Sequence, residues 1–127
     1  MIYCLMTQNK LNNLIILFLL ICIDTASLAQ NKSLEYYKQG NIYAKSEQYK
    51  KAIEQYNLSI EEDVEFYKSY RNKGSILSKL GNYKDAVIAY DQAIMLYDKD
   101  NLLFQIKGEA LLKRELYQEA LNSFNKA

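Results

Sequence analysis

Three residue types are missing from this chain of 127 residues, namely histidine, proline and tryptophan. Cysteine is nearly missing as well, because the only two, Cys4 and Cys22, both precede residue 30. Residues 30–127 therefore cannot form a Ser-His or Cys-His catalytic pair, a zinc site built from these ligands, or a disulfide. We expect the chain to have no enzyme activity, no catalytic residues, no cofactor and no metal site.

The chain also lacks an excess of charge of either sign. Sixteen Lys and Arg oppose fifteen Asp and Glu and leave a formal net charge of +1. Nucleic-acid grooves and polyanion sites need a clear basic excess, so neither is expected. The acidic run at 61–63 has no glycine turn and no alternating oxygen ligands, so we interpret it as a solvated turn rather than a calcium loop.

One long hydrophobic run is present, and it lies within the first 29 residues. The ten apolar residues LIILFLLICI occupy positions 14–23, and the small residues Ser27 and Ala29 follow them. A membrane-spanning helix needs about 20 apolar residues, so the pattern is typical of a secretory signal peptide. We predict that residues 1–29 are this signal and that cleavage after Ala29 exports the protein to the periplasm or the cell surface.

Two alternatives to cleavage remain for the N-terminal segment. If it stays uncleaved, it becomes a membrane anchor and the only part of the chain in contact with a membrane. Lipid attachment at Cys22 is disfavoured, because the bulky Ile21 precedes that cysteine where a lipoprotein signal needs a small residue.

Beyond residue 30, several residue types recur with a step of 34 residues. This period is the length of one helix-turn-helix unit of an α-solenoid. We predict an all-α domain at 30–127, built from antiparallel helical hairpins at 33–66, 67–100 and 101–127, the last one incomplete. The recurring sets are Gly40, Gly74 and Gly108; Tyr49, Tyr83 and Tyr117; Ala52, Ala86 and Ala120; and Tyr56, Tyr90 and Phe124.

The turns within the hairpins differ in how many turn-forming residues they contain. In the second hairpin Gly81 precedes Asn82, a natural helix N-cap, with Asp85 three residues further on. The equivalent turns at 46–48 and 114–116 contain no glycine, so only the period predicts them.

The recurring glycines are predicted to lie in the middle of the first helix of each hairpin. Glycine there costs about 1 kcal/mol relative to alanine, which calls for a packing reason. We expect each glycine to let the second helix approach closely. Large aromatic residues then fill the surrounding volume; these are Tyr36, Tyr43, Tyr56, Tyr70, Tyr90, Phe104 and Phe124.

These motifs resemble the tetratricopeptide repeat. The first-helix pattern is matched by Tyr36-Gly40-Tyr43, Tyr70-Gly74-Leu77 and Phe104-Gly108-Leu111, and the second-helix pattern by Ala52-Tyr56-Ser59, Ala86-Tyr90-Ala93 and Ala120-Phe124-Ala127. The proline that usually closes each repeat is replaced by Val64 and Asp98. The resemblance covers nearly all of residues 30–127. It implies a concave groove, lined by the first helices, that holds an extended or helical peptide of a protein partner.

The polar residues of the first helices are the candidate groove lining. Within this set the middle repeat is the most basic, and Lys68, Arg71 and Lys79 could pair with an acidic partner or remain merely solvated. The full set is Tyr37, Asn41, Lys45, Lys68, Arg71, Asn72, Ser75, Lys79, Gln105, Glu109 and Lys113.

The residues at particular positions of this chain disfavour one binding mechanism of the family. Members that bind a chaperone's C-terminal carboxylate use two asparagines and three cations. Both asparagines are present here, as Asn41 and Asn72, but the cation positions hold Tyr37, Leu102 and Ile106. Without those charges a carboxylate would be poorly compensated.

The third repeat stops at Ala127 without the polar capping helix that ends most arrays. Either the sequence continues in a longer protein, or the exposed apolar end associates with another subunit. We predict an exported protein-interaction adaptor. The alternative is the N-terminal sensory or scaffolding part of a longer exported or membrane-bound signalling protein, and a third hypothesis is a periplasmic assembly factor or cell-wall accessory.

Overall fold

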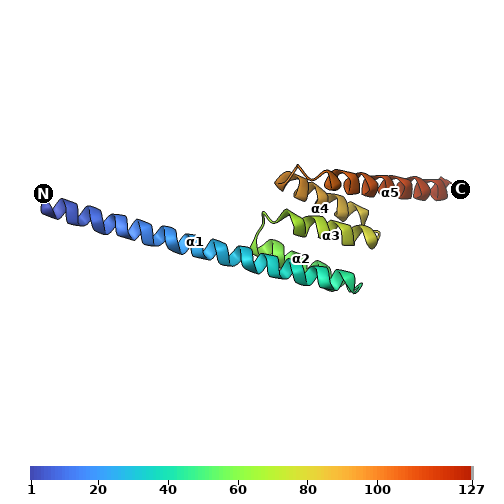
Figure 1. Ribbon diagram of the computed structural model, residues 1–127. Coiled ribbons are helices and arrows are strands. Elements are labelled where there is room, and N and C mark those ends of the chain that lie inside the picture. The colour runs from blue at the N-terminus through green and yellow to red at the C-terminus, as the bar shows by residue number, and fades with distance from the viewer. Residues whose placement is uncertain (127) are drawn as a thin grey trace.

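The computed structural model describes the backbone of residues 1–126 and the side chains of residues 1–116. This part of the chain is entirely helical, and successive packed helices lie side by side in chain order (Figure 1). The predicted all-α fold is confirmed. The helices are α1 (Ile2–Lys45), α2 (Tyr49–Glu62), α3 (Tyr67–Lys79), α4 (Tyr83–Leu96) and α5 (Asn101–Lys126).

Helix α1 is a single unbroken helix of 44 residues, but only its C-terminal part is packed. Every side chain from residue 1 to residue 28 is exposed, and Ser33 is the first buried residue. The N-terminal part of α1 therefore extends away from the other helices (Figure 1). Among the described residues, α1 alone is long and apolar enough to cross a membrane, a test that signal sequences also pass.

The turns that join α1 to α2 and α3 to α4 have the same geometry, 34 residues apart. The N–H of Gln48 donates to the carbonyl of Tyr43, and the N–H of Asn82 donates to that of Leu77, each at 2.9 Å. Each of these hydrogen bonds closes a six-residue turn of the Schellman type, which requires one residue in the left-handed conformation. Glu47 takes that conformation with φ 59°, at the position where the second turn has Gly81 with φ 79°. Both predicted turns are confirmed.

Helix α4 begins with the predicted cap. The Oδ1 atom of Asn82 accepts a hydrogen bond from the backbone N–H of Asp85, and the amide of Asn82 donates to the Asp85 carboxylate at 2.7 Å. Asp85 also places negative charge in the first turn, where the helix dipole favours it.

The glycines of the first two hairpins lie against tyrosine rings, as predicted. A Cβ atom added at Gly40 would lie 2.6 Å from the Cε1 atom of Tyr56, and one added at Gly74 would lie 2.5 Å from that of Tyr90. Since real Cβ atoms do not approach a ring this closely, only glycine allows these helix pairs to pack as they do.

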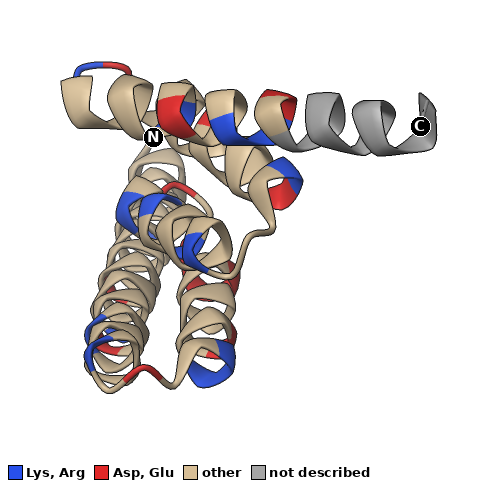
Figure 2. Ribbon diagram, turned by 90° about the vertical axis from the view of Figure 1, so that its right-hand side faces the viewer, with Lys and Arg blue, Asp and Glu red and all other residues tan. Residues whose placement is uncertain are grey.

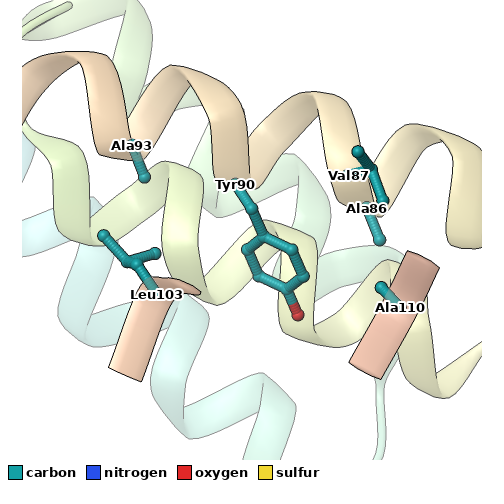
Figure 3. Close-up of a cluster of buried hydrophobic side chains, with 6 residues drawn as sticks. All are labelled: Ala86, Val87, Tyr90, Ala93, Leu103 and Ala110. Carbon is teal, nitrogen blue, oxygen red and sulfur yellow. The ribbon is translucent and has the colours of Figure 1, made fainter. Parts of the chain in front are cut away.

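Two clusters of buried side chains hold the helices together. One joins the second hairpin to α5, and its ring Tyr90 packs on Gly74 of α3. Its buried residues are Ala86, Val87, Tyr90 and Ala93 of α4 with Leu103 and Ala110 of α5 (Figure 3). The other joins α1, α2 and α3 around Ala52, Tyr56 and Ile76. Each cluster therefore connects one hairpin to the next helix, as expected for a stacked repeat.

A group of three fully buried serines joins α1, α2 and α3. Ser59 on α2 donates to the carbonyl oxygen of Ser33 at 2.8 Å, and its hydroxyl is 2.7 Å from that of Ser69 on α3. Small side chains let three helices meet here, and mutual hydrogen bonds remove the desolvation cost of burying hydroxyls.

The third repeat differs from the prediction. Residues 114–116 were expected to form a turn, but α5 continues through them without a break. Glu115 occupies the position of Glu47 and Gly81, and Leu116 occupies that of the N-caps Gln48 and Asn82. Arg, Glu and Leu are strong helix formers and Leu is a poor cap, so the local sequence favours a continuous helix.

Two residues of α5 differ in their surroundings from the equivalent residues of the first two repeats. Among the residues whose side chains are described, none lies within 4 Å of a Cβ atom added at Gly108, unlike the positions of Gly40 and Gly74. Phe104, expected in the core, is 50% exposed. Phe124, which the sequence also predicts in the core, lies outside the described side chains.

Candidate functional site

A cleft of about 340 Å³ opens between α1 and α3, the first helices of the first two hairpins. Helix α3 supplies one wall, and it contains Lys and Arg but no Asp or Glu (Figure 2). The cleft combines amide and hydroxyl groups with two lysines at its edge. Its lining residues are Asn41, Ala44, Lys45, Tyr56, Asn72, Ser75, Ile76 and Lys79.

A hydrogen-bond network fixes the two asparagines of the cleft. The Oδ1 atom of Asn41 accepts from the Tyr56 hydroxyl and from the Nδ2 atom of Asn72, both at 2.8 Å. The same Nδ2 atom donates to the hydroxyl of Tyr37 at 3.2 Å. With its amide oxygen held by two donors, Asn41 has only its own NH₂ group left to offer, so the cleft presents a fixed donor.

Burial makes the hydroxyl of Tyr56 a weaker acid. Desolvation raises the pKa of its hydroxyl above the ordinary value of 10. At neutral pH the hydroxyl is therefore protonated and donates to Asn41.

The second hairpin repeats this arrangement in weaker form. The hydroxyl of Tyr90 donates to Ser75 Oγ at 3.4 Å, and these two residues lie 34 positions after Tyr56 and Asn41. Both hairpins therefore aim the hydroxyl of their buried tyrosine at a polar residue of the first helix.

Three of the candidate residues, Lys45, Lys79 and Lys113, share one position of the repeat. The ammonium of Lys79 lies 5.9 Å from the ring centre of Tyr49, and Lys113 lies 5.9 Å from that of Tyr83. Each pair joins one hairpin to the preceding one, which adds about 0.5–1 kcal/mol at an exposed site. The 34-residue step shared by these lysines and tyrosines was a sequence signal of this contact.

Arg71 has an intramolecular partner. Its NH1 atom lies 2.9 Å from an oxygen of Asp100, and the side chains are 25% and 15% exposed. The other carboxylate oxygen of Asp100 accepts from the backbone N–H of Leu102 at the start of α5. Arg71 therefore connects α3 to the α4–α5 loop, which leaves it less available as a cation for a bound partner.

We expect Arg71→Ala to lower the free energy of unfolding by about 1–3 kcal/mol, because it leaves Asp100 partly buried without its charged partner. Urea titration measures this loss. Lys68→Ala is the matched control, since Lys68 is exposed on the same helix. Equal stability of the two variants would contradict the structural role of Arg71.

The remaining candidates do not line the cleft. The Nε2 atom of Gln105 donates to Glu109 on the exposed surface of α5 at 3.2 Å, so these two side chains bind each other. Tyr37 accepts from Asn72 through its hydroxyl, while its ring packs edge-on against Phe66 with ring centres 5.2 Å apart. Five of the eleven candidates thus meet in one cleft: Asn41, Lys45, Asn72, Ser75 and Lys79.

Three of the lining residues were not predicted from the sequence as site residues. They are Ala44, Tyr56 and Ile76. Tyr56 was predicted only as a core residue, because its aromatic ring follows the helical period. Its hydroxyl reaches the cleft from α2, which no spacing within α1 or α3 could indicate.

Two family models of the tetratricopeptide repeat match the chain, one at residues 36–63 and the other at residues 67–100. These ranges coincide with the two hairpins. The two hairpins are tetratricopeptide repeats. The packing of Gly40 and Gly74 against tyrosines is thus the helix contact of this repeat in two successive copies.

Solved structures share the arrangement of helices at low sequence identity. The second tetratricopeptide domain of Spaghetti (RPAP3), bound to the HSP90 peptide SRMEEVD, has a TM-score of 0.70 at 24% identity, covering 80% of this chain and 94% of that one. The Arabidopsis OM64 tetratricopeptide domain has a TM-score of 0.67 at 21% identity, covering 77% and 81%.

The MamA protein has a TM-score of 0.66 at 21% identity over 77% of this chain, which spans only 53% of MamA. No curated protein matches the sequence. At these identities the similarity establishes the fold.

Proposed function

We propose that this tetratricopeptide-repeat chain is a protein-interaction scaffold and that the cleft between α1 and α3 holds an extended peptide segment of its partner. The observation that supports this most is the fixed amide of Asn41. Its orientation is set by Tyr56 and Asn72, so its NH₂ group is a preorganised donor for a backbone carbonyl of the peptide.

The charges at the cleft indicate which side chains the peptide carries. Lys45 and Lys79 are its charged lining residues, and none of the carboxylates within residues 1–116 lines it. An acidic side chain two or more residues from the bound carbonyl can reach either ammonium. The peptide's free C-terminus is not the anchor, because Ile106, at one of the family's cation positions, instead packs against the α4–α5 core.

Peptide display against residues 30–127 tests this proposal. We expect the selected peptides to contain Asp or Glu and to bind at least tenfold more weakly to Asn41→Ala and to the double variant Lys45→Ala/Lys79→Ala. Lys84→Ala, an exposed change on α4, is the control and should bind as the parent does. Selected peptides that bind all four proteins equally would refute the assignment of the cleft.

The scaffold functions outside the cytoplasm in this proposal, with residues 1–29 as its export signal. The exposure of every side chain from 1 to 28 supports it, because removing this segment breaks no packing contact in the folded part. Ser33, the first buried residue, would remain in the mature chain.

Mass spectrometry of the protein produced in a bacterial host tests cleavage, and we expect a mature N-terminus at Gln30. Recovery of the full-length chain in the membrane fraction would instead favour the anchored form. The continuity of α1 supports this second candidate, because an uncleaved span would pass without a break into the first repeat of a membrane-bound signalling protein.

A further inference from the structure

A second hollowed surface runs along α3 and α4, on a face of α3 that the cleft does not use. A hollow of about 340 Å³ adjoins one of about 150 Å³ there, since Gln92 of α4 lines both. We call their joint surface the outer groove. Its main residues, none of which lines the α1–α3 cleft, are Tyr70, Lys73 and Leu77 of α3 and Ile88, Gln92 and Met95 of α4.

The outer groove exposes more apolar surface than the repeat requires. Met95 is 86% exposed, Val64 at one end of the groove is 63% exposed, and Ile88 is 50% exposed. In the first hairpin the positions of Ile88 and Met95 hold Glu54 and Glu61, which are also exposed. The fold therefore tolerates charge at both positions, and the apolar side chains are specific to the second hairpin. Such an exposed apolar surface marks an interaction site.

The outer groove has two apolar ends and a polar centre. Tyr70 and Met95 line one hollow, and Leu77 and Ile88 line the other. On each helix the two apolar residues are seven positions apart, which is about two turns or about 10.5 Å. Lys73 lies between the apolar residues of α3 and so marks the centre.

A helix matches this spacing, and an extended peptide does not. Residues i and i+7 of a helix share one face and lie about 10.5 Å apart. Along a strand, residues on one face are about 6.6 Å or 13 Å apart. Two side chains of an extended peptide therefore cannot enter both ends of the groove together. In a bound helix, the residue three or four positions after the first apolar one lies over Lys73.

Lys73 determines the charge that fits this central position. The ion pairs within residues 1–116 involve Lys32, Arg71 and Lys107 but not Lys73. An acidic side chain of a partner would therefore meet a cation that has no carboxylate partner in this part of the chain. A second copy fits less well, because an interface symmetric about the groove centre brings two Lys73 ammonium groups together.

We propose that the outer groove binds an amphipathic helix of a partner protein, with apolar residues at i and i+7 and Asp or Glu at i+3 or i+4. The outer groove and the α1–α3 cleft share no lining residue, so this proposal does not depend on the function of the cleft. A scaffold with both surfaces holds a helix and an extended peptide at the same time.

Display of a randomised library of alanine-rich helical peptides against residues 30–127 tests the proposal. This target keeps every buried residue of the described part, since each side chain from 1 to 28 is exposed. We expect selected helices to carry the predicted pattern and to bind at least tenfold more weakly to Ile88→Glu and to Met95→Glu. Both variants should fold, because the first hairpin has glutamate at the equivalent positions. Asn41→Ala, a change in the cleft, should bind as the parent does.

A charge exchange tests the centre of the groove. Lys73→Glu should weaken binding of the selected helices tenfold or more, and changing the acidic residue of the peptide to Lys should restore it. Lys38→Glu is the matched control, because Lys38 is exposed on α1 and does not line the groove. It should leave the affinity unchanged.

The inference is overturned if no selected helix loses affinity for Met95→Glu, or if the exchanged charges do not restore binding. A dimer of residues 30–127 that Met95→Glu dissociates would show instead that a second copy covers the groove. Flotation with phosphatidylcholine vesicles that is lost in Met95→Glu would assign the surface to a membrane and also contradict a partner helix.

Discussion

Gly74→Leu is expected to lower the free energy of unfolding by about 3 kcal/mol or more, at the upper end of overpacking costs. The first side-chain carbon alone would lie 2.5 Å from a ring atom of Tyr90, which is only 2% exposed and cannot turn away. Replacing glycine in a helix also gains up to about 1 kcal/mol of helix propensity, but this gain is smaller than the clash. The urea midpoint measures the difference.

Two further variants make this result specific to the glycine–tyrosine contact. Lys73→Ala changes the neighbouring position of α3 and should stay within about 0.5 kcal/mol of the parent. Tyr90→Leu in the Gly74→Leu background should recover part of the loss, because it removes the ring that the new side chain strikes. Strictly additive effects of the two changes would mean that they do not share a contact.

Tyr56→Ala should cost about 3–5 kcal/mol, because it empties a site at the junction of α1, α2 and α3 where the ring is 1% exposed. Tyr56→Phe keeps the ring and removes only the hydroxyl bonded to Asn41. Its expected cost is about 1 kcal/mol. Urea denaturation of the two variants separates the packing of the ring from the hydrogen bond of its hydroxyl.

Peptide affinity gives Tyr56→Phe a second readout. The Asn41 oxygen would keep only one of its two donors, so its amide would no longer be held in one orientation. We expect the variant to bind cleft-selected peptides several-fold more weakly while remaining folded. Tyr90→Phe, the matched change in the second hairpin, removes a longer hydrogen bond to Ser75 and should affect binding less. Equal affinities of Tyr56→Phe and the parent would show that the hydroxyl of Tyr56 does not contribute to peptide binding.

The sequence predicted the first two hairpins because their packing is local and repeats. Gly74 allows a second helix to pack closely, and the ring of Tyr90 fills the buried volume beside it. Both residue types recur at the same 34-residue step. The same step also predicted a turn at 114–116 that did not form. There the period is outweighed by local helix propensity, since Arg114, Glu115 and Leu116 favour a continuous helix over a turn.

The site was predicted less completely than the fold. The resemblance to the tetratricopeptide repeat assigned Asn41 and Asn72 to the groove, and both line the cleft. It could not indicate that Arg71 would bind Asp100, because that contact joins α3 to a loop 29 residues away. Side-chain partners across repeats depend on how the hairpins stack, and the period does not specify this.

Site-specific photocrosslinking tests the central claim that the α1–α3 cleft is where a partner binds. A photoreactive residue at Ala44, which lines the cleft, should crosslink a cleft-selected acidic peptide, and unlabelled peptide should compete. The same residue at Lys84 on α4 should give no crosslink. Equal labelling from both positions, or labelling from Lys84 alone, would contradict the assignment of the cleft as the binding site.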